Sequence, residues 1–360
     1  MPRVLVLNNY PLDNLWREAE NGQTPDHLMF GVNYLPDHGF EVKLAPMNAH
    51  RWLSWLSVQL PKWRWPFPLG DLDQQWAARK LLEDADLIYA PCQTQTPVLA
   101  CLRSLGWLKR PIVALAHHPL ERGRLTRIRK PFWRRVVNGT DYFPALCATV
   151  AREINALANS PGKSEVLPWG PDARYYPPAE YPGEGVVCAG RTARDLITFG
   201  LAASAAGCLT RIICLKSQIV PDFCGFGRKV EVLPQPQSNW MGYPELCGFY
   251  AKARALAIPL HPSTSLAGYT SLMDALGMGK PVIMTRLPIF DFDVEALGIG
   301  KWVAPGDQAG WRAALEWFDH NPETAISMGQ KARRLVEEGL NSHSFADRVA
   351  RLLKQALQRH

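Results

Sequence analysis

The sequence predicts an α/β protein made of two doubly wound domains, each with a parallel sheet covered by helices. Three observations carry this prediction. Short apolar runs alternate with helix-like stretches, the alternation is interrupted once by a stretch rich in Pro and Gly, and it then starts again. At 360 residues the chain is long enough for two such domains of ordinary size.

The first domain is expected over residues 1–170. Its strand candidates are short and aliphatic, which is typical of strands buried on both faces of a parallel sheet. They are Val4–Leu7, Glu41–Ala45, Asp86–Ala90, Pro111–Ala116 and Tyr142–Leu146. The helix candidates between them are His27–Leu35, Gln74–Asp84, Pro97–Leu105 and Val150–Ala158.

Residues 171–184 form a linker rich in Pro and Gly, and the second domain is expected over 185–342. Its strand candidates are Gly185–Ala189, Leu209–Leu215, Val230–Leu233, Ala255–Leu260 and Val282–Thr285. A last helix, at 343–360, is expected to pack back on the first domain. Ligands of such sheets bind beyond the carboxyl ends of the strands, so we expect a site in a cleft between the domains.

The composition limits the classes of protein to consider. No stretch approaches the roughly 20 apolar residues of a membrane-spanning helix, and the first residues lack the pattern of a signal peptide, so we expect a cytoplasmic protein. The eight cysteines show no C-x-x-C pair and no His at zinc-ligand spacing. They are interpreted as reduced thiols, mostly buried, and no metal is expected.

The segment His261–Lys280 begins with a loop of small polar residues that leads into a helix. A helix that starts in this way presents unpaired backbone N–H groups to an anion. The residues expected to hold phosphate are Gly268, Tyr269, Thr270 and Ser271. Asp274 lies one turn later, where its carboxylate can reach a ribose hydroxyl. The alternative is a helix cap followed by a surface Asp.

The run PSTSLAGYTSLMDALGMGKPVI, at 262–283, resembles the donor-site signature of retaining family-4 glycosyltransferases. GRTARD at 190–195, VAPGD at 303–307 and the linker stretch LPWGPDARYYPP resemble other segments of that family. The resemblance covers most of the chain. It implies the GT-B fold, with a nucleoside-diphosphate sugar as donor substrate, held mainly by the second domain without a cofactor, and it favours uridine as the base.

The resemblance also implies roles for single residues. Gly190, Arg191 and Arg194 would contact the diphosphate, because a guanidinium grips phosphate oxygens in pairs and stabilises the leaving group. Asp274 would replace the Glu that binds ribose. The family's other Glu, which touches the sugar, falls on Leu266. This departure leaves open which sugar is transferred and whether its configuration is retained.

In the first domain, PIVALAHHPL at 111–120 places two histidines at the end of an expected strand. The resemblance implies that one contacts the donor sugar, and its frame favours His117 over His118. A neutral imidazole could hydrogen-bond a hydroxyl or accept a proton; the alternative is that one His packs under the loop. The family's early Gly-Gly loop is missing, and Gly22 is the nearest candidate for a loop over the diphosphate.

Two segments of the first domain combine aromatic and basic residues. Four tryptophans lie in 51–70, namely Trp52, Trp55, Trp63 and Trp65. The run 122–135 has seven basic residues and no acid, and it includes Arg127, Lys130 and Arg134. This combination is typical of a surface that docks on an anionic membrane; the alternative is a packed helix beside a solvated basic face. No recognised module favours nucleic acid.

The function expected from these observations is glycosyl transfer from a nucleotide sugar to a hydroxyl acceptor, lipid-linked or located at a membrane. By resemblance the transfer retains configuration, and the enzyme is expected on the inner face of the membrane as a peripheral protein. One alternative is a binding protein of the same fold that has lost turnover. Another is a different chemistry on this fold, such as inverting transfer or epimerisation.

Overall fold

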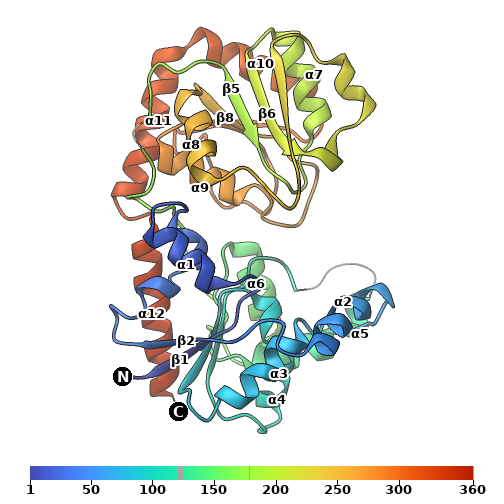
Figure 1. Ribbon diagram of the computed structural model, residues 1–360, viewed down its shortest axis with the longest axis vertical. Helices are drawn as coiled ribbons and strands as arrows, with labels where there is room; N and C mark the ends of the chain where they lie inside the picture. The colour runs from blue at the N-terminus through green and yellow to red at the C-terminus, as the bar shows by residue number, and fades with distance from the viewer. Residues whose placement is uncertain (121–124, 178, 360) are drawn as a thin grey trace. The chain divides into compact units, whose positions relative to one another are not determined.

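The computed structural model describes residues 1–120, 125–177 and 179–359. Its contacts divide the chain into two compact units. Unit 1 comprises Met1–Glu20, Asp26–Trp169 and Ser342–His360, and unit 2 comprises Asn21–Pro25 and Gly170–Asn341. Each unit holds one parallel sheet with helices packed on it (Figure 1), so the fold class predicted from the sequence is confirmed.

Unit 1 has a four-stranded sheet in the order β2-β1-β3-β4, with every neighbouring pair parallel. The strands are β1 (Arg3–Val6), β2 (Glu41–Leu44), β3 (Leu87–Ala90) and β4 (Ile112–Ala114). The helices are α1 (Leu12–Glu20), α2 (Arg51–Lys62), α3 (Leu72–Leu81), α4 (Pro97–Ser104), α5 (Thr126–Gly139), α6 (Ala148–Leu157) and α12 (Ser342–Gln358). The described residues of the unit also form the short 3₁₀ helices η1 (Asp26–Met29), η2 (Val32–Tyr34) and η3 (Gln93–Gln95).

The last helix, α12, comes from the far end of the sequence and belongs to unit 1. It packs against β3, β4 and η2, and its buried face includes Phe345, Val349 and Leu353. Gly31 allows this close approach, because a Cβ at that position would lie 3.0 Å from the Cα of Ala346. An apolar stripe at helical spacing therefore anchors the C-terminal segment.

Two expectations for unit 1 were wrong in detail. The helix predicted at 27–35 is divided into η1 and η2, because Phe30 (φ 49°) and Gly31 (φ 82°) adopt left-handed backbone that an α-helix does not contain. The strand predicted at 142–146 forms only isolated bridges, which join Tyr142 to Val113 and Ala145 to Ala116. Pro144 lies inside that stretch and has no N–H to donate to a neighbouring strand.

Unit 2 has a six-stranded parallel sheet in the order β10-β9-β8-β5-β6-β7. Its strands are β5 (Val186–Ala189), β6 (Thr210–Leu215), β7 (Val230–Gln235), β8 (Ala255–Ile258), β9 (Val282–Thr285) and β10 (Gly300–Val303). Its helices are α7 (Leu196–Ala206), α8 (Tyr243–Lys252), α9 (Tyr269–Met278), α10 (Gln308–His320) and α11 (Pro322–Glu337). Two short 3₁₀ helices, η4 (Lys216–Gln218) and η5 (Pro221–Gly225), follow β6.

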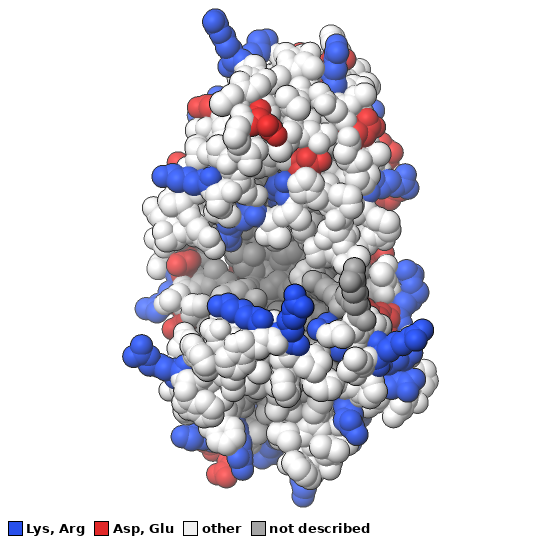
Figure 2. Space-filling model, turned by 90° about the vertical axis from the view of Figure 1, so that its right-hand side faces the viewer, with Lys and Arg blue, Asp and Glu red and all other residues white. Residues whose placement is uncertain are grey.

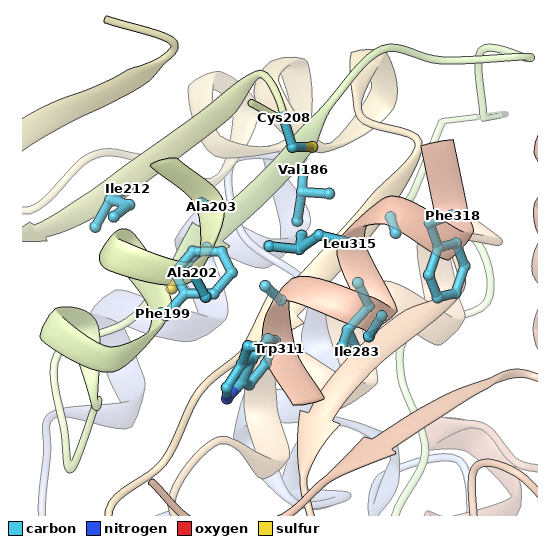
Figure 3. Close-up of a cluster of buried hydrophobic side chains, with 14 of the residues drawn as sticks. Val186, Phe199, Ala202, Ala203, Cys208, Ile212, Ile283, Trp311, Leu315 and Phe318 are labelled. Atoms are coloured by element: carbon cyan, nitrogen blue, oxygen red, sulfur yellow. The ribbon is translucent and has the colours of Figure 1, made fainter. Parts of the chain in front are cut away.

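The core on one face of this sheet lies between the strands and helices α7 and α10 (Figure 3). Phe199 of α7 meets Trp311 of α10 edge to face, with ring centroids 5.1 Å apart. Cys188 and Cys214 are fully buried beside them, and all eight cysteines are free thiols. This layer fixes the strands whose carboxyl ends carry the candidate site.

Lys280, in the G-M-G-K run, is fully buried in unit 2 and is not offered to a ligand. Its Nζ donates to the carbonyls of Glu180 and Ala253, each at 2.7 Å. Burial lowers the pKa of this amine to about 8. The lysine thus ties the linker to the end of α8, which is a structural role.

None of the helices within the described residues is long and apolar enough to cross a bilayer.

Candidate functional site

The candidate donor site of unit 2 is formed by two loops that follow neighbouring strands. The loop after β5 (190–195) lies against the loop after β8, because Arg194 bridges to Leu260 and the His261 amide donates to the Ala193 carbonyl at 2.9 Å. Since β5 and β8 are parallel neighbours, their carboxyl ends meet at one edge of the sheet. The sequence placed Gly190, Arg194 and Ser271 in one site, and the structure brings them together.

Arg194 occupies the centre of this site. Its guanidinium donates to the carbonyls of Thr192 (2.9 Å) and Ala189 (3.2 Å) and to the hydroxyl of Ser271 (2.9 Å). Gly190 leaves the space that the guanidinium fills, because a Cβ there would lie 2.3 Å from one of its nitrogens. The position of the Arg194 guanidinium therefore requires a glycine at residue 190.

Within the described residues Arg194 has no ion-pair partner, and the Asp274 carboxyl interacts with its charge only beyond ion-pair distance. The side chain is 7% exposed, and no carboxylate of the described residues forms an ion pair with it. Its Nε is buried without a hydrogen-bond partner in the described part of the chain. Burial lowers the pKa of this guanidinium, yet an arginine stays protonated in proteins. A buried cation with a spare donor favours the binding of an anion.

The N-terminus of α9 adds donors to the same corner. Gly268 precedes the helix in left-handed backbone (φ 84°), and a Cβ there would lie 2.7 Å from a methyl of Ile258. Thr270 is exposed, and Ser271 also donates to the Ala189 carbonyl. Tyr269 differs from expectation: its side chain is buried near Phe290, and its amide donates to the Leu266 carbonyl. We therefore leave its side chain and amide out of the group that would hold phosphate.

Asp274 is a buried carboxyl, not the surface Asp of the alternative interpretation. It is 3% exposed, and its Oδ1 accepts a hydrogen bond of 2.6 Å from the hydroxyl of Tyr176. Burial raises the pKa of Asp274 to about 7, against the opposing effects of that hydrogen bond and of Arg194. The carboxyl thus titrates near neutral pH, which is a property of many functional sites. Tyr176 comes from the linker and was not recognised in the sequence.

The two arginines of the loop after β5 differ in position. Arg191 is exposed, and its guanidinium lies over the ring of Trp240 at 5.4 Å. Its carbonyl accepts from Gln218 at 3.3 Å. Arg191 therefore stands at the rim, where it can move toward a ligand, whereas Arg194 is fixed. Leu266, at the position of the missing Glu, is buried.

The segment Asn21–Pro25 groups with unit 2 although it lies early in the sequence. The hydroxyl of Tyr175 donates to the carbonyl of Gln23 at 3.2 Å. Gly22 is exposed and has left-handed backbone (φ 66°), and a Cβ at this position would have no neighbouring atom within 4 Å. This loop is thus attached to unit 2 through Tyr175 of the linker.

His117 follows β4 of unit 1 and is held in one tautomer. Its Nε2 faces the Pro91 carbonyl at 2.6 Å, and a carbonyl only accepts, so the proton is on Nε2 and Nδ1 is an acceptor. Burial lowers the pKa of His117 to about 4, so the ring is neutral at pH 7. This favours the role of hydrogen-bond acceptor over that of proton acceptor. Gln93, which the sequence did not single out, accepts from the amides of His117 and His118.

An aromatic–basic surface covers another part of unit 1; we use this name for α2, the segment 63–67 and α5. Its tryptophans are exposed: Trp52 64%, Trp55 56%, Trp63 59% and Trp65 47%. The basic side chains Arg127, Lys130 and Arg134 of α5 are exposed as well. Arg122 and Arg124 of the same run lie outside the described residues.

The two halves of this surface are joined by contacts. Phe67 packs on Phe132 of α5, with ring centroids 5.6 Å apart, and Arg129 donates to the Pro66 carbonyl at 2.5 Å. Figure 2 shows the side of unit 1 on which α2 and α5 lie, and there Lys and Arg side chains predominate over acidic ones. The alternative of buried, packed tryptophans is wrong for these four residues.

Comparisons with known proteins show which family and which fold this chain resembles. Residues 32–175 match the family model described as Glycosyltransferase Family 4. A sucrose-phosphate synthase from Thermosynechococcus elongatus has a similar structure, with a TM-score of 0.70, 15% identity and full coverage of both chains. No curated protein sequence matches the chain. The resemblance to family-4 enzymes is confirmed for residues 32–175, and the chain has the GT-B fold.

Two further solved structures share this fold. HepE from Anabaena, in complex with UDP, has a TM-score of 0.63 and 15% identity, with 99% of this chain and 100% of that one covered. WaaG, a glycosyltransferase involved in lipopolysaccharide biosynthesis, also has a TM-score of 0.63 and 15% identity, with 97% and 99% covered. Within the described residues, no group of three or more His, Cys, Asp or Glu side chains could hold a metal ion.

Proposed function

We propose that the protein transfers a sugar from a uridine-diphosphate sugar to a hydroxyl group of an acceptor, with retention of configuration. The observation that carries this proposal is the buried, unpaired charge of Arg194 beside the N-terminus of α9. It supplies what a leaving diphosphate needs, namely fixed donors in a site of low dielectric constant. The UDP complex of HepE, which shares the fold, supports uridine.

In this proposal each residue acts on a different part of the donor. Arg194, Ser271 and the first turn of α9 bind the diphosphate and stabilise the charge that develops as it leaves. Arg191 closes over it from the rim, and Asp274 accepts a hydrogen bond from ribose. In unit 1, taken by itself, the neutral His117 would act as a hydrogen-bond acceptor through Nδ1. Leu266 offers no carboxylate to the sugar, so we assign no protein nucleophile.

The test is incubation of the full-length protein with a panel of UDP-sugars, followed by measurement of slow hydrolysis and of UDP affinity. We expect UDP release with at least one sugar, and loss of both readouts in Arg191→Ala with the protein still folded. Stabilisation by UDP without hydrolysis or transfer would instead indicate a binding protein. Unchanged affinity in Arg191→Ala would show that the rim arginine does not contact the diphosphate.

We further propose that the acceptor is linked to a lipid and that the aromatic–basic surface docks on an anionic membrane. Exposed tryptophans bury their rings at headgroup depth, while each nearby Lys or Arg contributes about 1 kcal/mol of attraction to anionic lipid. Four exposed tryptophans and at least three exposed cations on adjoining elements suit this role better than contact with water. WaaG, which is involved in lipopolysaccharide biosynthesis, supports an acceptor of this class.

Liposome flotation tests the docking. The wild type should float with vesicles containing phosphatidylglycerol and not with neutral ones, and the double change Arg127→Glu and Arg134→Glu should lower binding at least tenfold. Trp52→Ser with Trp55→Ser should also lower binding to the anionic vesicles. The matched controls are Trp107→Ser, which removes a tryptophan 78% exposed outside this surface, and Arg312→Glu in unit 2. Equal losses in the controls would exclude a specific docking face.

A further inference from the structure

Tyr176 of the linker is a buried phenol whose hydroxyl lies on the carboxyl of Asp274. It donates to Oδ1 at 2.6 Å. Burial raises the pKa of Tyr176 well above its ordinary value, so the phenol keeps its proton and acts as the donor. The other oxygen, Oδ2, has no hydrogen-bond partner among the described residues and is not fully buried. The carboxyl therefore has one oxygen held by the protein and one left for a ligand.

One face of α9 carries the residues that meet the linker and the loop after β5. Ser271, Asp274 and Gly277 are spaced three apart, which places them in a row along a helix. The hydroxyl of Ser271 accepts a hydrogen bond from Arg194. Gly277 leaves room for the ring of Tyr176, because a Cβ there would lie 2.3 Å from a ring atom. The contact between Tyr176 and Asp274 thus depends on a glycine one helical turn later.

The linker segment that carries Tyr176 is fixed by bonds that do not involve Asp274. Arg333 belongs to α11, which packs against α9 (Figure 1). Its guanidinium donates to the carbonyl of Ala173 at 2.8 Å and to that of Gly277 at 2.7 Å. The Asp172 carboxylate accepts two backbone amides of the same segment, at 2.9 and 3.1 Å. One arginine therefore joins the linker to the end of α9, and the phenol is held in place before it meets the carboxyl.

The groups around Asp274 determine how much this hydrogen bond matters. Burial raises the pKa of Asp274, whereas the hydrogen bond from Tyr176 and the charge of Arg194 lower it. Arg194 comes from the loop after β5. The other titratable groups near the carboxyl come from the linker and α8, and burial raises the pKa of each, so that they are neutral at pH 8: Tyr175, Tyr243, Cys247 and Tyr250. In surroundings of this low polarity a hydrogen bond to a carboxylate is strong.

From this geometry we infer that Tyr176 is a positioning residue for the donor: it fixes Asp274 so that Oδ2 binds one of the two ribose hydroxyls. The inference rests on the proposed function, in which Asp274 binds ribose. A carboxylate with both oxygens free accepts two neighbouring hydroxyls, one at each oxygen. Here the phenol already occupies Oδ1. The site therefore rejects a nucleotide that lacks one ribose hydroxyl and tolerates a nucleotide that lacks the other.

Calorimetric titrations of the full-length protein at pH 8 with UDP, 2′-deoxy-UDP and 3′-deoxy-UDP test this inference. We expect one deoxy analogue to bind the wild type about tenfold more weakly than UDP, and the other to bind within about twofold of UDP. Tyr176→Phe keeps the ring beside Gly277 and removes the hydroxyl. It should reduce the tenfold preference to about twofold, because the carboxyl is no longer fixed.

The matched control is Tyr181→Phe. It removes another linker hydroxyl, which donates to the carbonyl of Gly279 at the same distance of 2.6 Å. This variant should keep the wild-type preference among the three nucleotides. The control thus separates the loss of the bond to Asp274 from the loss of a linker hydroxyl in general.

The pH dependence of stability gives a second readout, which needs no ligand. The folded chain holds a proton on Asp274 that the unfolded chain has lost, so stability falls as the pH rises from about 4 to the folded pKa of about 7. Without the hydrogen bond from Tyr176 the folded pKa rises further. In thermal unfolding from pH 5 to 9 the fall should therefore continue about one pH unit higher in Tyr176→Phe than in the wild type. Tyr176→Phe in an Asp274→Asn background, and Tyr181→Phe alone, should show no such extension.

The possible failures are distinguishable. If UDP binds and Tyr176→Phe keeps the wild-type preference among the nucleotides, the inference is overturned while the donor proposal stands. Equal losses with both deoxy analogues in the wild type would also overturn it, because both ribose hydroxyls would then be bound. Failure of UDP to bind the wild type would overturn the donor proposal and the inference together.

Discussion

Arg194→Met is expected to lower the affinity for UDP on the order of 100-fold while leaving the affinity for uridine unchanged. The buried guanidinium has an Nε without a hydrogen-bond partner and no ion pair among the described residues, so its charge is available to the diphosphate. Loss of one or two charge-assisted hydrogen bonds costs about 3 kcal/mol. Uridine lacks phosphate and does not use them. Parallel calorimetric titrations with UDP and with uridine measure the ratio of the two affinities.

Stability separates this role from a merely structural one. Methionine fills most of the arginine's volume, and replacing a buried unpaired charge by an apolar side chain is often neutral or stabilising. We therefore expect the free energy of unfolding of the variant, measured by thermal unfolding, to differ from that of the wild type by no more than about 2 kcal/mol. The matched control is Arg333→Met, which also removes bonds from a guanidinium to two backbone carbonyls, those of Gly277 and Ala173. The control variant should keep the wild-type ratio of UDP affinity to uridine affinity. An equal loss of affinity for both ligands in Arg194→Met would contradict the proposal.

Asp274→Asn is expected to weaken the binding of a UDP-hexose at least tenfold at pH 8 and, at the same pH, to raise the stability of the protein. An ionised carboxylate accepts a ribose hydrogen bond more strongly than an amide does. Wild-type affinity should rise as the pH rises through about 7, the pKa to which burial shifts Asp274, and the affinity of the variant should stay flat. A UDP-hexose is the right probe because its diphosphate diester does not titrate in this range.

The effect on stability follows from the same shift. Asp274 has a folded pKa of about 7 and an unfolded pKa near 4, so between these values the folded chain holds a proton that the unfolded chain has lost. The wild type therefore loses stability as the pH rises from about 4 to 7, by an amount on the order of a few kcal/mol. Thermal unfolding measured from pH 5 to 8 should show that the stability of the Asn variant, relative to that of the wild type, increases with pH. Asp195→Asn, at the N-cap of α7, is the control. Parallel pH profiles for wild type and Asp274→Asn would contradict the assignment.

The sequence was most informative where chemistry depends on local chain order. The alternation of strands and helices predicted both parallel sheets, and the G-R-x-x-R and small-residue loops were found at neighbouring strand ends. The family match nevertheless falls on residues 32–175, largely outside the segment that carried the resemblance. Local pattern did not reveal the break at Phe30 and Gly31, where the backbone is left-handed and Gly31 lies close to Ala346 of α12, a neighbour distant in sequence.

The sequence by itself determined the class of fold, the two loops of the candidate donor site and the basic and aromatic character of one surface. Only the tertiary structure decided what each group can do. It buried Arg194 without an ion pair among the described residues, placed Tyr176 of the linker on Asp274, and fixed the tautomer of His117 through the Pro91 carbonyl. Burial, pairing and pKa depend on neighbours distant in sequence, and no local pattern records them.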